Sequence, residues 1–103
     1  MILIYVTCKN KKEAEKIGRH LLKRRLVACA KVASKVESRF WWKGKIDKAD
    51  EILLILVSTE DKFNSIEKET LKLHSYEVPE IFSIKVDKVH KPYLNWLMEE
   101  TRT

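Results

Sequence analysis

The sequence predicts an α+β fold that forms one domain over residues 1–103. Short apolar runs rich in β-branched and aromatic residues indicate strands. Two segments with apolar residues at helical spacing lie between these runs. Only two glycines and two prolines interrupt the 103 residues, and no linker or low-complexity tract divides them.

The first two predicted elements are a strand over residues 1–7 and a helix that begins after Asn10. Asn10 is a favourable N-cap, and Glu13 three residues later completes a capping box. The basic run 23–25 suits the last helical turn, where free carbonyl groups favour cations. The apolar stripe of this helix consists of Ala14, Ile17, Gly18, Leu21 and Leu22.

Residues 26–33 are predicted as the second strand and residues 51–58 as the third. Polar residues gather over 34–39, but residues compatible with a strand return at Val36 and over 40–42. Gly44 is expected to form the turn that leads into the third strand.

Thr59 is the expected cap of a second helix. Residues 74–79 are predicted as a loop, because the residue before Pro79 resists the helical conformation. A fourth strand follows over 81–86, and Pro92 starts a last helix that continues over 93–100. The inner face of the second helix carries Phe63, Ile66, Thr70 and Leu73.

The resulting order is β-α-β-β-α-β with an additional C-terminal helix, which is the order of a ferredoxin-like plait with both crossover helices on one sheet face. A strand whose other face met water should alternate apolar and polar residues. Residues 2–6 and 52–57 do not alternate. Leaving five or six large apolar side chains exposed would forfeit a sum comparable to the whole stability of a small domain, about 5–15 kcal/mol. The sequence therefore predicts assembly of copies through their sheets.

The charge pattern favours an ordinary solvated surface over a nucleic-acid-binding patch. Charged residues make up 35% of the chain and the net charge is +6, but acidic and basic residues alternate along most of it. Such a charge-rich composition is typical of thermostable proteins. We expect no secretion signal and no membrane span, since the apolar runs are too short. Cys8 and Cys29 lack metal-finger spacing, so free thiols in the cytoplasm are expected.

Four motifs resemble the CutA family of divalent-cation tolerance proteins, and the resemblance runs nearly end to end. They are residues 26–30 (LVACA), 42–45 (WKGK), 74–80 (HSYEVPE) and 93–97 (YLNWL). The resemblance implies a ferredoxin-like homotrimer with strands packed and extended across subunits. It also implies kinship in shape with the nitrogen-regulatory PII proteins.

The chain departs from the family pattern in three places. The usual His-Pro-Tyr reads His74-Ser75-Tyr76, and Lys31 replaces an asparagine. Copper-binding members carry a cysteine where this chain has Val6, and Cys8 follows two residues later. Period-two alternation would keep Cys8 on the strand face of Val6.

The candidate metal ligands are His74, Cys29 and Cys8, for copper or another divalent cation. The competing interpretations are a buried apolar cysteine for Cys29 and a helix-end histidine for His74. His20 and His90 are expected on the surface.

An intersubunit pocket for a small anionic ligand is the second candidate site, although aromatic residues are also common anchors of interfaces. The resemblance places Cys29 in it. The full predicted set is Cys29, Trp42, Lys45, Tyr76, Tyr93 and Trp96. The predicted subunit interface includes the hairpin residues Phe40, Trp41, Trp42 and Gly44. The turn at Gly44 is expected to be the tip of a long ribbon that reaches a neighbouring subunit.

The leading functional hypothesis is a cytoplasmic, trimeric metal-tolerance protein that binds a metal or a small ligand and is not an enzyme. No histidine–carboxylate pair activates a nucleophile, and no phosphate loop or zinc-enzyme motif occurs. The alternative is a PII-like signalling trimer that binds an anionic effector, or an unidentified protein partner. RNA binding is the third class, but residues 52–57 lack the aromatic residues that stack bases.

Overall fold

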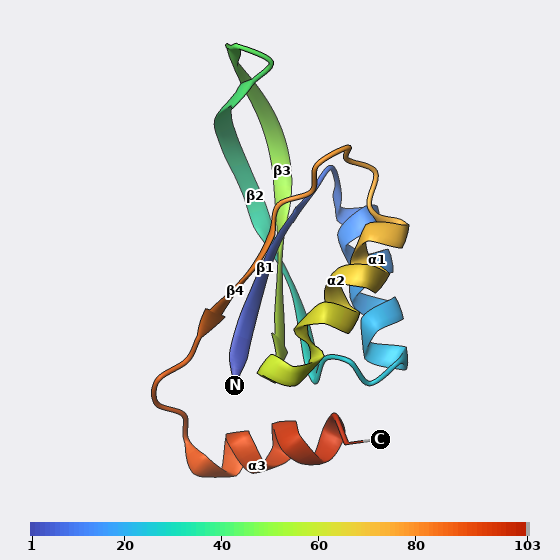
Figure 1. Ribbon diagram of the computed structural model, residues 1–103, viewed down its shortest axis with the longest axis vertical. Helices are drawn as coiled ribbons and strands as arrows, with labels where there is room; N and C mark the ends of the chain where they lie inside the picture. The colour runs from blue at the N-terminus through green and yellow to red at the C-terminus, as the bar shows by residue number, and fades with distance from the viewer. Residues whose placement is uncertain (103) are drawn as a thin grey trace.

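The computed structural model describes residues 1–102 and contains a four-stranded antiparallel sheet and three α-helices (Figure 1). The predicted α+β class and element order are confirmed. In chain order the elements are β1 (Ile2–Cys8), α1 (Lys11–Lys23), β2 (Cys29–Trp42), β3 (Lys45–Ser58), a 3₁₀ turn (Glu60–Lys62), α2 (Phe63–Leu73), β4 (Ile81–Lys85) and α3 (Lys91–Glu100).

Helix α1 begins at the predicted cap. The side-chain oxygen of Asn10 accepts the N–H of Glu13 at 2.9 Å. The reciprocal bond is displaced by one residue, because Glu13 Oε1 accepts the N–H of Lys9 at 3.0 Å. Further along, a Cβ at Gly18 would lie 3.1 Å from the Cβ of Ala30. The glycine therefore lets the helix pack close against β2.

The sheet has the strand order β2-β3-β1-β4, and each neighbouring pair is antiparallel. Helices α1 and α2 lie on the same side of it (Figure 1). Val6 and Cys8 are both buried in the core, as the alternation along β1 predicts. The buried core cluster consists of Ile2, Ile4, Val6, Cys8, Ala14, Ile17, Leu21, Val27, Leu54, Leu56 and Ile66.

Strands β2 and β3 are longer than the predicted ranges 26–33 and 51–58, and together they form the long ribbon expected around Gly44. Its strands run to Trp42 and from Lys45, so residues 34–39 and 45–50 are strand and not loop. An exposed ribbon is held by cross-strand hydrogen bonds and needs no apolar periodicity, which is why the sequence pattern misses it. The turn at Gly44 is confirmed, with φ of 51° at Lys43 and 82° at Gly44. Two consecutive positive φ values are typical of a two-residue type I′ turn.

A β-bulge interrupts β2 between Val32 and Lys35, which pair with Leu54 and Ile52. Before the bulge, Cys29 lies opposite Val57. After the bulge, the pairs Val36–Glu51, Ser38–Ala49, Phe40–Asp47 and Trp42–Lys45 occupy the sheet face opposite the helices.

That open face carries large apolar side chains, as the unalternating strands predict. Leu3, Leu53 and Ile55 are half-buried on it. Tyr5 stacks on Phe82 there, with ring centroids 4.8 Å apart and planes 12° from parallel. Helix α3 crosses the end of the sheet remote from the hairpin tip (Figure 1). Residues 1–102 of a single chain thus leave the open face uncovered.

Candidate functional site

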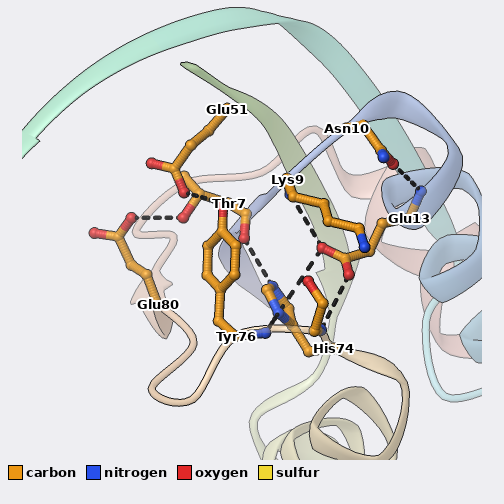
Figure 2. A network of polar contacts seen from close by, with 9 residues as sticks. Thr7, Lys9, Asn10, Glu13, Glu51, His74, Tyr76 and Glu80 are labelled. Carbon is orange, nitrogen blue, oxygen red and sulfur yellow. Dashed lines mark hydrogen bonds and ion pairs between the residues drawn. The ribbon is translucent and has the colours of Figure 1, made fainter. Parts of the chain in front are cut away.

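A polar cluster lies where β1 ends and the loop after α2 returns to the sheet (Figure 2). Strand β1 supplies Thr7 and Cys8, α1 supplies Glu13, and the loop supplies His74 and Tyr76. Residues separated by more than 60 positions in the sequence meet here through hydrogen bonds. The end of β1 is therefore the place where the chain concentrates titratable side chains.

His74 has a fully buried side chain with both ring nitrogens engaged. Its Nε2 lies 2.8 Å from the backbone carbonyl of Thr7. Because a carbonyl can only accept, Nε2 carries the proton and donates it. Its Nδ1 accepts the backbone N–H of Tyr76 at 3.2 Å. These two bonds assign the neutral Nε2–H tautomer.

Glu13 is the acidic member of the cluster, and each of its oxygens accepts a backbone hydrogen bond. Oε1 accepts from Lys9 and Oε2 from Ser75, both at 3.0 Å. Burial by itself would raise the pKa of Glu13, but the hydrogen bonds from Ser75 and Lys9 lower the pKa below its ordinary value. The side chain is therefore a carboxylate at neutral pH.

Cys8 completes a group of three potential ligand atoms. Its sulfur, a Glu13 oxygen and a His74 nitrogen all lie within 4.8 Å of one another. Burial, and then the carboxylates of Glu13 and Glu51, raise the pKa of the Cys8 thiol to about 12. Because the thiolate is the form that ligates metals and attacks electrophiles, the protonated thiol of Cys8 has low reactivity at neutral pH.

Two further carboxylates, Glu51 and Glu80, lie on the open face near the end of β1. The Tyr76 hydroxyl donates to Glu51 Oε2 at 2.9 Å, and the Thr7 hydroxyl donates to Glu80 Oε1 at 3.1 Å. Burial, and next the hydrogen bond to Glu51, raise the pKa of Tyr76, so its hydroxyl stays protonated and donating. Thr7, Glu51, Tyr76 and Glu80 line a groove of about 750 Å³ on the open face.

The predicted metal ligands fall into two places. The structure brings Cys8 and His74 together and adds Glu13. Cys29 lies apart from them, because it begins β2 opposite Val57, whereas Cys8 lies opposite Ile52. Cys8 also faces the helices, while Cys29 is half-buried on the open face. Within one chain the three residues do not form a common site.

The predicted pocket residues are also spread along the molecule. Trp42 and Tyr76 line the groove. Lys45 follows the hairpin turn, and Cys29 lies at the opposite end of β2. Tyr93 and Trp96 contact each other on α3, with ring centroids 5.4 Å apart.

The predicted interface residues divide between the two faces of the hairpin. Phe40 and Trp42 lie on the open face through their pairing with Asp47 and Lys45. Trp41 pairs with Ile46 on the other face and is 73% exposed. Gly44 forms the turn at the tip.

Glu51, Glu80 and the contact of Glu13 with Ser75 were not predicted from the sequence. Glu51 stands directly before the apolar run 52–57, and a lone carboxylate at the edge of such a run is a signal that could have found it. Glu80 follows Pro79 in a stretch without periodicity, so no comparable signal exists.

The fold and the cluster define a small antiparallel α+β protein with potential ligand groups at the end of its first strand. Residues 2–100 match the family model described as CutA1 divalent ion tolerance protein. The chain belongs to the CutA divalent-cation tolerance family. It is 46% identical over 99 residues to the divalent-cation tolerance protein CutA of Thermotoga maritima, covering 96% of this chain and 97% of that protein. Identity to the protein of the same name from Pyrococcus horikoshii is 41% over 102 residues, covering 99% of both.

Solved structures show the same fold. The crystal structure of a point mutant of CutA1 from Pyrococcus horikoshii superposes with a TM-score of 0.94 at 40% identity over the whole of both chains. The structure of CutA from Archaeoglobus fulgidus, which is described as a periplasmic protein, gives a TM-score of 0.95 at 35% identity and covers 99% of this chain and all of that one. No helix in residues 1–102 has the length and apolar character that a membrane span requires.

Proposed function

We propose that the chain is a homotrimeric divalent-cation tolerance protein that acts by binding a metal ion or a small ligand, without catalytic turnover. Membership of the CutA family supports the link to divalent cations. The observation that supports assembly into a trimer is the uncovered apolar face of the sheet. On this face Phe82 and Ile84 are 41% and 51% exposed. We also propose that the sheet and helices form a ferredoxin-like plait and that the protein is located in the cytoplasm.

Covering the open face with other copies would contribute a large part of the stability. Each fully buried large apolar side chain contributes about 1.5–3 kcal/mol. The chain is elongated, with extents of 45 × 26 × 23 Å, because the hairpin projects beyond the body of the sheet (Figure 1). A projecting ribbon with Phe40 and Trp42 on the open face is suited to reach a neighbouring subunit.

The Cys8–Glu13–His74 group does not fit a resident copper ion. Both nitrogens of His74 and both oxygens of Glu13 already form hydrogen bonds. Cys8 is also fully buried, with an exposed fraction of 0%. Cys29 is the soft ligand that remains, since it is half-buried on the face that other copies would cover. We therefore propose that Cys29 contacts the metal near a subunit boundary. A metal site that also includes His74 and Cys8 stays a prediction.

Copper titration of the purified protein tests this proposal. We expect about one site per subunit by calorimetry, lost in Cys29→Ser and kept in Cys8→Ser. His74→Ala distinguishes a structural role of His74 from a role as a metal ligand. If the variant still binds copper, His74 is structural; if a folded trimer of the variant no longer binds copper, His74 is a ligand. Light scattering on the eluted protein checks the trimer, and a monomer at micromolar concentration would contradict the assembly.

No observation favours the PII-like alternative. The groove carries more carboxylates than basic groups, and Lys45, the expected partner of an anion, is not among its lining residues. The acidic residues that line the groove are Glu37, Asp47, Glu51, Glu77 and Glu80, against the basic residues Arg39 and Lys48.

A further inference from the structure

The net positive charge of the chain is concentrated in α1 and the residues that flank it. Residues 9–25 contain eight lysines and arginines against two glutamates, which gives this segment a net charge of +6. The rest of the chain contains thirteen basic and thirteen acidic residues, and their charges cancel. The alternation of signs along most of the sequence therefore conceals a separation of charge, because one segment carries the net charge of the whole chain.

Four exposed cations form a row along the outer side of α1, which we call the basic row. Residues three or four positions apart share one face of a helix. The opposite face carries Ala14, Ile17 and Leu21, which are buried against the sheet. At 1.5 Å per residue, the row from its first to its last member is about 16 Å long. Its members are Lys12, Lys16, Arg19 and Lys23.

The basic row lacks acidic partners, whereas the cations beside it are paired. His20 and Arg24 lie against Glu69 of α2, and Arg25 pairs with Glu100 of α3. Within residues 1–102 no ion pair includes a member of the row. Like charges at neighbouring helix positions repel one another. The row is therefore suited to a partner that carries several negative charges along a line.

The position of α1 keeps the basic row accessible in the proposed assembly. Helices α1 and α2 lie on one side of the sheet (Figure 1), and the assembly covers the other side. In a closed assembly the helix layers of the copies would face outward in different directions, so a flat membrane would meet one row at a time. Helix α1 also contains no aromatic residue, the type that enters the interface of a lipid bilayer. These features favour a linear polyanion over a membrane surface.

We propose that the basic row of α1 binds the phosphate backbone of a nucleic acid duplex without reading its sequence. Each strand of a duplex carries one phosphate per about 3.4 Å of its axis, so the row lies beside about five phosphates. Lysine and arginine are common donors to phosphate oxygens. The row contains none of the asparagine or glutamine side chains that read adenine. This surface is distinct from the metal contact proposed at Cys29 and does not depend on it.

Fluorescence anisotropy of a short labelled DNA duplex, titrated with the full chain, tests the proposal. We expect saturable binding at about 50 mM sodium chloride, and a plot of log K against log salt with a slope of about −3 to −4, for four phosphate contacts. The double variant Lys16→Gln with Arg19→Gln keeps the helix propensity but removes two contacts. It should weaken binding about tenfold or more at this salt concentration and make the slope shallower by about two.

The matched control is the double variant Lys88→Gln with Lys91→Gln. It removes the same charge from two exposed residues outside α1, so its slope should equal that of the wild type. Circular dichroism checks that both double variants are folded. Lys12→Gln with Lys23→Gln gives the same comparison if the first pair of substitutions does not fold.

Three results would overturn the proposal. The first is the absence of saturable, salt-dependent binding, and the second is an equal loss of affinity in the α1 variant and in the control. The third is binding to phosphatidylserine vesicles without binding to the duplex, which would assign the row to a membrane. Equal affinity for two duplexes of unrelated sequence supports recognition of the backbone alone, and a strong preference for one of them would contradict it.

Discussion

His74 donates its Nε2–H to the main-chain carbonyl of Thr7 across 2.8 Å and thereby joins the loop after α2 to the end of β1. The next residue is also held, because the N–H of Ser75 donates to Glu13 at 3.0 Å. The loop is therefore fixed at two consecutive residues, by a neutral imidazole and by an ionised carboxylate. This geometry makes the cluster a structural clamp for the segment that carries Tyr76 into the groove.

Removing the imidazole should destabilise the fold. His74→Ala leaves the Thr7 carbonyl and the Tyr76 N–H without their partners and opens a cavity, so we expect a loss of about 1–3 kcal/mol. Denaturant unfolding at a fixed protein concentration measures it. His90→Ala is the control, because His90 is exposed and forms no side-chain cap bond, and it should change stability by less than about 0.5 kcal/mol. Equal stability of the two variants would contradict the clamp.

Ser75 occupies the position where the family pattern has proline. Proline has no N–H, so Ser75→Pro removes the donor to Glu13 Oε2. We expect Ser75→Pro to be less stable than Ser75→Ala, which keeps the N–H, by about 1 kcal/mol. Urea unfolding of the two variants under the same conditions makes the comparison. A more stable proline variant would show that the fixed backbone outweighs the hydrogen bond in this chain.

The Cys8 thiol should resist alkylation in the folded protein. Its pKa of about 12 leaves little thiolate at pH 8, and the side chain is buried. Iodoacetamide labelling followed by mass spectrometry of peptides should find Cys8 unmodified until denaturant is added. Cys29→Ser isolates the signal of Cys8, and rapid labelling of that variant in native buffer would refute the prediction.

Glu69 of α2 links the two helices. It lies 2.8 Å from His20 Nε2, 3.2 Å from Arg24 and 3.0 Å from Lys72. The hydrogen bond from His20, followed by that from Lys72, lowers the pKa of Glu69 from 4.5 to about 2. Since the folded pKa is below the unfolded one, the contribution of Glu69 is complete above pH 4.5 and is lost as the pH falls toward 2. Glu69→Gln should therefore flatten the melting temperature as a function of pH in this window, whereas Glu67→Gln should leave its slope unchanged.

Gly18 and Ala30 form a coupled pair across the helix–sheet contact. Alanine at position 18 gains about 1 kcal/mol of helix propensity but places its Cβ 3.1 Å from that of Ala30. We expect the two effects nearly to cancel in Gly18→Ala, and Gly18→Val to lose about 1–3 kcal/mol through overpacking. In an Ala30→Gly background, Gly18→Ala should become stabilising. A double-mutant cycle without coupling energy would refute this account.

The order of the elements, the Asn10 cap and the Gly44 turn were predictable because each depends on local periodicity or on turn chemistry. The lengths of β2 and β3 were not, since residues 34–39 and 45–50 pair as an exposed ribbon without an apolar face. The expected surface position of His20 is only partly met. Its side chain is 35% exposed but reaches Glu69, 49 residues away.

The candidate site could also be predicted only where it depends on contacts between residues close in sequence. The sequence identified Glu13 as a helix-capping residue, which is a contact over three or four positions. Its bond to Ser75 spans 62 positions and depends on how the loop returns to the sheet. Such a contact leaves no periodic signal, so Cys8 and His74 were predicted from the sequence as ligands, whereas the place of Glu13 beside them became visible only in three dimensions.

The bulge in β2 has a consequence for how the hairpin tolerates changes in its length. Between Val32 and Lys35 the strand carries one residue more than its partner. Deletion of Ser34 would remove this additional residue and leave the pairs from Lys35–Ile52 to Trp42–Lys45 in frame. Deletion of Glu37 would instead put Phe40 and Trp42 out of frame, so that Arg39 and Trp41 would replace them on the open face. The effect of a single deletion in β2 thus depends on its position: at the bulge it preserves the register, whereas a few residues later it exchanges the side chains on the two faces of the hairpin.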